Sequence, residues 1–122
     1  MDFQVIDKYD GVSLVLSKLE FEQGPSEYNI VVTLSEREDD FADQADRLLS
    51  AYNDFCSEKL PFATPVFERY FLSDIANQQP VLEKMIEPVP GNAVSIVEQP
   101  PLNGTKIALW AYLQKGVELK AL

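Results

Sequence analysis

The chain has 122 residues, 46% of them hydrophobic, and a net charge of −10, which is the composition of one globular domain. The acidic balance argues against binding to nucleic acids, whose phosphates must be neutralised by Lys and Arg, and against docking on an anionic membrane. The sequence has no histidine and a single cysteine, which excludes imidazole catalysis, an intrachain disulfide and a cysteine metal cluster.

The sequence also lacks signals for membrane insertion and secretion. No apolar run reaches the roughly 18 residues of a membrane-spanning helix. The N-terminus has neither the basic nor the apolar region of a signal peptide. We therefore expect a reduced, cytoplasmic protein that needs no metal or cofactor.

Three strands are predicted in the first third of the chain. They cover residues 3–7, 12–21 and 28–34, and the third is rich in β-branched residues. Asp10-Gly11 predicts a tight hairpin between the first two strands, because type I′ turns need positive φ. Residues 23–26 predict the next turn.

A long helix follows. From Phe41 to Cys56 the apolar side chains recur at helical spacing and form one stripe. Asp39 or Asp40 is expected to cap its start, and Leu60-Pro61 to end it. Because Cys56 lies on the apolar stripe, we expect an inert buried thiol there.

The middle of the chain predicts a strand and a second helix. Residues 66–72 have strand composition, and Glu68 and Arg69 must point to opposite faces of that strand. Asn77 is expected to be the N-cap of the second helix, because that places Pro80 in the first turn, where proline is tolerated.

Two closing strands are predicted at residues 93–98 and 105–113, with a tight turn at Asn103-Gly104. Residues 114–122 could form strand, helix or tail. The order β-β-β-α-β-α-β-β predicts an α+β fold, a mixed sheet with both helices packed on one face. Association with other subunits is the expected way to cover the other face.

This order resembles the YjgF/RidA family. Residues 44–58, 66–74, 93–100 and 107–112 are similar in kind and spacing to the family's first helix, its middle strand, its small-residue strand ending in proline and its closing strand. The resemblance implies a chorismate-mutase-like fold and a homotrimer whose sheets face a central barrel. It also implies small-molecule sites in the clefts between subunits.

A closer likeness is to the YjgF-like N-terminal part of chorismatase-type enzymes. It is carried by residues 26–28, 41–45, 71–74, 77–78 and 99–104. In those enzymes the recognisable catalytic residues lie in a further C-terminal portion. Residues 1–122 are therefore expected to form one YjgF-like domain, either a whole protomer or the front piece of a longer chain.

The residues that serve the family's deaminases do not carry over. The resemblance implies a carboxylate-binding Arg just before the small-residue strand, where this chain has Gly91-Asn92-Ala93. It also implies a Glu on the closing strand, and residues 106–110 contain no acid. We therefore expect a small-metabolite-binding or assembly module with no assigned catalytic residue. The alternatives are an active enamine or imine deaminase and an acidic protein-interaction domain.

Five residues remain as candidates for a site. Arg69 could anchor an anion, or be an exposed or ion-paired strand residue. Glu98 could position water beside Gln99, or both could belong to a surface turn. Trp110 and Tyr112 share a strand face, where packing in the core or a subunit interface is favoured over stacking on a ligand.

Overall fold

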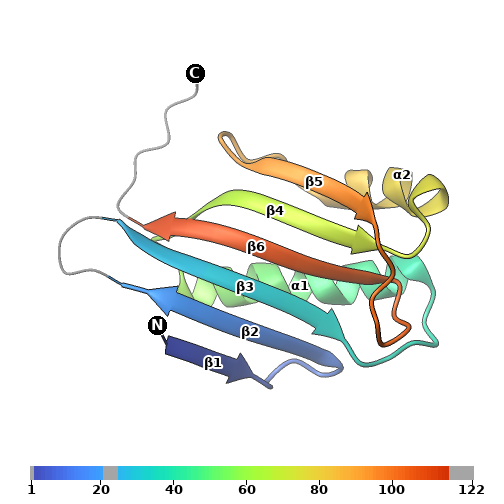
Figure 1. Cartoon of the computed structure of the whole chain (residues 1–122), viewed down its shortest axis with the longest axis horizontal. Helices are drawn as coiled ribbons and strands as arrows, with labels where there is room; N and C mark the ends of the chain where they lie inside the picture. Colours follow the sequence, from blue (N-terminus) through green and yellow to red (C-terminus); the bar gives the residue numbers. More distant parts are fainter. Residues whose placement is uncertain (1, 21–24, 116–122) are drawn as a thin grey trace.

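The computed structural model describes residues 2–20 and 25–115, and Figure 1 shows them as one broad sheet with two helices behind it. The elements in chain order are β1 (Asp2–Ile6), β2 (Val12–Leu19), β3 (Ser26–Leu34), α1 (Phe41–Lys59), β4 (Thr64–Leu72), α2 (Ile75–Met85), β5 (Ala93–Glu98) and β6 (Ile107–Lys115). The predicted order of strands and helices is confirmed.

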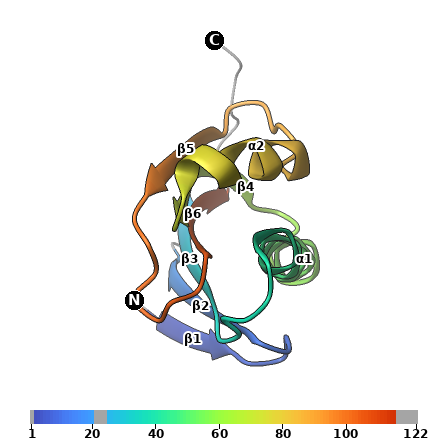
Figure 2. The same ribbon diagram turned by 90° about the vertical axis from the view of Figure 1, so that its right-hand side faces the viewer.

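The six strands lie in the order β1-β2-β3-β6-β4-β5. Every neighbouring pair is antiparallel except β4 and β5, which run parallel and are joined through α2. The last strand therefore lies in the middle of the sheet, between β3 and β4. Figure 2 shows α1 and α2 on the same side of the sheet and no helix on the other, as predicted.

Strand alternation decides which side chains meet the helices. Along β6 the residues at every second position are almost wholly buried: Ile107, Leu109, Ala111 and Leu113. The residues between them, such as Trp110 and Tyr112, are only half-buried and point to the other face. The same alternation runs along β2 and β3, so one sheet face forms the core.

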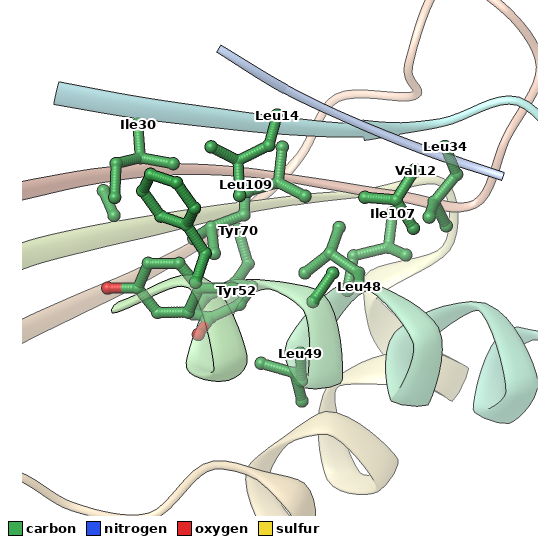
Figure 3. Close-up of a cluster of buried hydrophobic side chains, with 14 of the residues drawn as sticks. Val12, Leu14, Ile30, Leu34, Leu48, Leu49, Tyr52, Tyr70, Ile107 and Leu109 are labelled. Atoms are coloured by element: carbon green, nitrogen blue, oxygen red, sulfur yellow. The ribbon is translucent and has the colours of Figure 1, made fainter. Parts of the chain in front are cut away.

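Helix α1 supplies the second layer of the core. Figure 3 shows Leu48 and Tyr52 between the helix and the strands, where both are buried. The Asp40 carboxylate accepts a hydrogen bond from the Asp43 N–H at 2.9 Å, so of the two predicted candidates, Asp39 and Asp40, the cap is Asp40. The helix ends at Lys59 with Leu60 as its C-cap, where the sequence predicts the end.

A buried glutamine fixes the start of α1 against the sheet. The Gln44 Nε2 donates to the Asp39 carbonyl at 2.8 Å, and its Oε1 accepts from the Lys106 N–H at 2.8 Å. Gln44 is fully buried, and these bonds satisfy its amide there. It therefore joins the helix to the segment that leads into β6.

The second helix begins earlier than the sequence predicts. Its N-cap is Asp74 and not Asn77, which leaves Pro80 inside the helix. Gln78 makes this start stable, because its Oε1 accepts from the Asp74 N–H at 2.9 Å and its Nε2 donates to the Ser73 hydroxyl at 2.9 Å. We expected the position of Pro80 to fix the first turn of this helix. The side-chain bonds of Gln78 fix the start of the helix instead.

The first connection also differs from the prediction. Five residues, 7–11, join β1 to β2, and among the described residues only glycines have positive φ, Gly11 at 71°. A tight turn is present at Asp10-Gly11, where the Val12 N–H donates to the Tyr9 carbonyl at 3.2 Å, but it is not type I′, which needs positive φ at both central positions. The tight turn predicted at Asn103-Gly104 is confirmed, because the Gly104 N–H donates to the Pro101 carbonyl at 3.1 Å.

The remaining turn and tail predictions are tested only in part. Residues 23–24 of the second turn and residues 116–122 lie outside the described residues. Strand β6 extends to Lys115, so Gln114 and Lys115 belong to a strand. Neither helix in the described part of the chain is long and apolar enough to cross a membrane.

Replacing Leu48 by alanine should destabilise the fold strongly. The Leu48 side chain is fully buried between α1 and the sheet, so the change leaves a cavity that costs about 2–5 kcal/mol. Chemical unfolding measures the loss. Leu102→Ala is the control, because Leu102 is fully exposed and its loss should change stability by about 0.5 kcal/mol or less. Equal effects of the two changes would contradict this packing.

Candidate ligand site on the open sheet face

The sheet face that points away from both helices, here called the open face, carries many apolar side chains. Phe3, Val5 and Val31 on this face are 69%, 63% and 42% exposed. Strand register places further apolar and aromatic residues on it: Val15, Phe67, Phe71, Val97, Trp110 and Tyr112. Apolar surface of this extent marks an interaction site on a protein surface.

Arg69 lies among these aromatic residues. Its guanidinium carbon is 5.2 Å from the centre of the Phe67 ring, which is a cation–π contact. The Phe67 and Trp110 rings are 5.4 Å apart, and Trp110 lies directly opposite Arg69 across the β4–β6 pair. The Phe67 ring, itself packed against Trp110, therefore contacts the guanidinium.

The guanidinium of Arg69 keeps unused donors. Its Nε is buried and has no hydrogen-bond partner within the described residues. No described carboxylate lies within 4.0 Å of it, so the ion pair that the sequence left open is not formed in this part of the chain. Since a guanidinium has five N–H donors in a fixed fork, this group is suited to grip a carboxylate.

Two polar contacts orient the aromatic residues of β6. The Trp110 Nε1–H donates to the Asn29 Oδ1 at 3.2 Å, and the Gln114 Nε2 donates to the Tyr112 hydroxyl oxygen at 2.8 Å. Burial raises the pKa of Tyr112, with a further contribution from Glu27, so its hydroxyl stays protonated near neutral pH. Its single O–H donor is directed to Glu27, so Tyr112 contributes its aromatic ring to this group of side chains.

Glu98 and Gln99 lie away from the aromatic residues around Arg69, at the end of β5. The Glu98 Oε1 accepts from the Ile75 N–H at 3.0 Å, so this carboxylate binds the start of α2. Gln99 is exposed, and its backbone N–H continues the strand contact to the Leu72 carbonyl at 3.0 Å. Glu98 pairs with Leu72 across β4 and β5, so its side chain lies on the helix side of the sheet. Arg69 lies on the open face, so the two side chains of one chain do not meet.

Phe67 and Asn29 belong to this group of side chains, although the sequence did not single them out. Their strands could be predicted, but their neighbours depend on β6 lying between β3 and β4. The aromatic composition of residues 66–72 was the one available signal for Phe67. Asn29 had none, because a lone amide in a strand has no characteristic pattern.

The described residues contain no group of three or more His, Cys, Asp or Glu that could hold a metal ion. Cys56 is half-buried, and burial followed by the nearby Glu68 carboxylate raises the pKa of its thiol to about 12. A thiol with that pKa is almost wholly protonated near neutral pH and is therefore a slow nucleophile. This agrees with the inert thiol that the sequence predicts.

No family model and no curated protein matches the chain. Its structure is similar to a crystal structure from Salmonella typhimurium, described as "a putative translation initiation inhibitor", with a TM-score of 0.52 and 13% sequence identity. The match covers 94% of this chain and 97% of that chain. The fold is YjgF-like.

This YjgF-like fold agrees with the fold class that the sequence predicts. At 13% identity the likeness extends to the fold and not to the residues of a site. The open face and its aromatic residues must therefore be judged by their own geometry. That geometry supplies one cationic group with free donors and a broad apolar surround.

Removing the Glu98 carboxylate should weaken α2. The Asp74 carboxylate accepts from the Asn77 side chain and caps no backbone N–H of the helix, so Glu98 supplies the acceptor for the Ile75 N–H. Glu98→Ala is expected to lower the free energy of unfolding by about 1 kcal/mol, the typical value for a lost helix cap.

The control is Glu83→Ala, which removes an exposed carboxylate from the same helix and leaves its first turn intact. It should change stability by about 0.5 kcal/mol or less. Chemical unfolding and amide exchange at Ile75 measure both variants. An unchanged Glu98→Ala protein would show that this contact does not hold the helix.

Proposed function

We propose that this chain is a divergent YjgF/RidA-like domain that associates with copies of itself through the open face and binds a small metabolite in the clefts between them. The observation that carries the proposal is the uncovered apolar face, with Val31 and the β1 side chains exposed beside Arg69. Burying such a face is strongly favourable. The resemblance to the family implies three copies.

The ligand class follows from Arg69. Its free donors lie beside Phe67 and Trp110, which offer apolar surface to the rest of a ligand. A small carboxylate with an apolar or unsaturated body fits both features. A cleft at the edge of the associated faces would exclude water and strengthen the pairing of the two charges.

An assembly role is part of the same proposal. If the chain is the YjgF-like front part of a chorismatase-type enzyme, association through this face would position catalytic residues that lie elsewhere. The domain itself would then need no deaminase chemistry. The absence of an acid from residues 106–110 supports this, because the family's deaminases position water with an acid on that strand.

The enzymatic alternative has weaker support. It requires Glu98 to position water near a substrate held by Arg69, and Glu98 is bound to the start of α2 on the helix side. The acidic protein-interaction alternative rests on the net charge of −10. It predicts a monomer whose open face is covered by a different protein.

A charge on the open face should prevent association. Val31 is 42% exposed on the central part of this face, and Val31→Glu would place a carboxylate in the proposed interface. An unpaired buried charge should weaken association by about 100-fold or more. The single tryptophan, Trp110, is directly opposite Val31 and reports the change.

Trp110 emission of the wild type should shift to the red on dilution as the face becomes exposed to water. The Val31→Glu protein should show the red-shifted emission at every concentration. Val81→Glu is the control, because Val81 is similarly exposed but lies on α2, so it should behave like the wild type. Concentration-independent emission of the wild type would contradict association through this face.

The proposal also predicts the outcome of an enzyme assay. With no positioned acid, the chain should not accelerate hydrolysis of 2-aminoacrylate over buffer, and Arg69→Ala should match the wild type. Clear acceleration that is lost in both Arg69→Ala and Glu98→Gln would establish the deaminase alternative instead.

A further inference from the structure

A cavity of about 660 Å³ lies on the helix side of the sheet, between α1 and the segment that follows α2. We call it the helix cavity. Its apolar walls include Leu49, Met85 and Leu113, which come from both layers. It is also lined by the Glu68 carboxylate and by the phenols of Tyr52 and Tyr70. Exposed Asn53, Ser57 and Glu87 also line it, so solvent can reach the interior and a second carboxylate lies at its exposed part.

Glu68 is the one charged side chain that is fully buried among the described residues, at 6% exposure. Three neutral donors bind it: the Tyr52 hydroxyl at 2.6 Å, the Asn92 Nδ2 at 3.0 Å and the Tyr70 hydroxyl at 3.4 Å. No described Lys or Arg forms an ion pair with it, and none lines the helix cavity. A carboxylate in this position lacks the cation that normally accompanies a buried charge.

The acceptors around Glu68 are not fully used. A carboxylate has about four acceptor sites, and one of its three bonds, from Tyr70, is long. The Asn92 Oδ1 is also buried and has no partner within the described residues. Asn92 does not line the helix cavity, so the spare acceptor capacity there is that of Glu68, whose negative charge lies beside apolar walls with no described Lys or Arg among them.

The other reactive-looking groups of the helix cavity are protonated near neutral pH. Burial, followed by the charge of Glu68, raises the pKa of Tyr52 and of Tyr70 above the ordinary phenol value. The same causes raise the pKa of Cys56, which also lines the helix cavity. With neither a thiolate nor a phenolate available, the helix cavity is suited to binding and not to covalent chemistry.

We propose that the helix cavity binds a small organic ammonium ion, with the nitrogen against Glu68 and the apolar part against Leu49, Met85 and Leu113. The ammonium group supplies N–H donors and the missing positive charge, and the volume is ordinary for a small-ligand site. This site is on the opposite side of the sheet from Arg69 and does not depend on the function proposed for the open face.

The direct test compares three probes of similar shape: benzylammonium, benzyl alcohol and benzoate. Titration calorimetry with the wild-type chain should give benzylammonium an affinity about 10- to 100-fold above benzyl alcohol, the range expected for a hydrogen bond to a charged group. Benzoate should not bind, because Glu68 repels it. Equal affinities for the ammonium ion and the alcohol would overturn the proposal.

Glu68→Gln keeps the shape of the side chain and removes its charge, so the preference for benzylammonium should disappear. Glu58→Gln is the matched control, because it makes the same change in net charge at an exposed residue that does not line the helix cavity. It should bind like the wild type. A preference that survives in folded Glu68→Gln, or is lost in Glu58→Gln, would contradict a site at Glu68.

A second readout needs no variant, in case Glu68→Gln fails to fold. Cys56 is the only cysteine, so an excess of a disulfide reagent such as dithiodipyridine modifies one known position in the helix cavity, and does so slowly because the thiol is almost wholly protonated near neutral pH. Saturating benzylammonium should slow this reaction several-fold while leaving the emission of Trp110, on the open face, unchanged. Unprotected Cys56, or a response of Trp110 alone, would place any binding elsewhere and overturn the proposal.

Discussion

The position of β6 between β3 and β4 is the constraint on which the rest of the structure depends. This strand pairs with both neighbours over almost its whole length, and Leu109 and Trp110 mark its two faces, one in the core and one on the open face. A shift of one residue would exchange those faces and bury Trp110 under α1. The register of β6 therefore determines what each side of the sheet can bind.

The same alternation separates two adjacent residues of opposite charge. Glu68 points to the helix side, where three neutral donors hold it, and Arg69 points to the open face beside aromatic rings. One peptide unit in β4 thus places an acceptor site on one face and a donor site on the other. The two proposed ligands follow from this, a cation in the helix cavity and a carboxylate on the open face.

Much of this architecture could be predicted from local patterns. The apolar stripe and the Asp40 cap define α1, and the opposite directions of Glu68 and Arg69 follow from strand geometry. Alternation alone cannot say which of those two residues is buried, because two of the three donors to Glu68 come from outside β4, one from α1 and one from the loop before β5. The early start of α2 escaped prediction because it depends on the Gln78 bonds to Ser73 and Asp74, and on Glu98, which binds the Ile75 N–H from another strand.

We propose above that copies of this chain cover the open face, and the particle mass in solution tests this most directly. Sedimentation equilibrium should give three times the 13.8-kDa mass of the chain at high concentration, with dissociation on dilution. A mass of 13.8 kDa at every concentration would contradict the claim and leave the open face to a different partner.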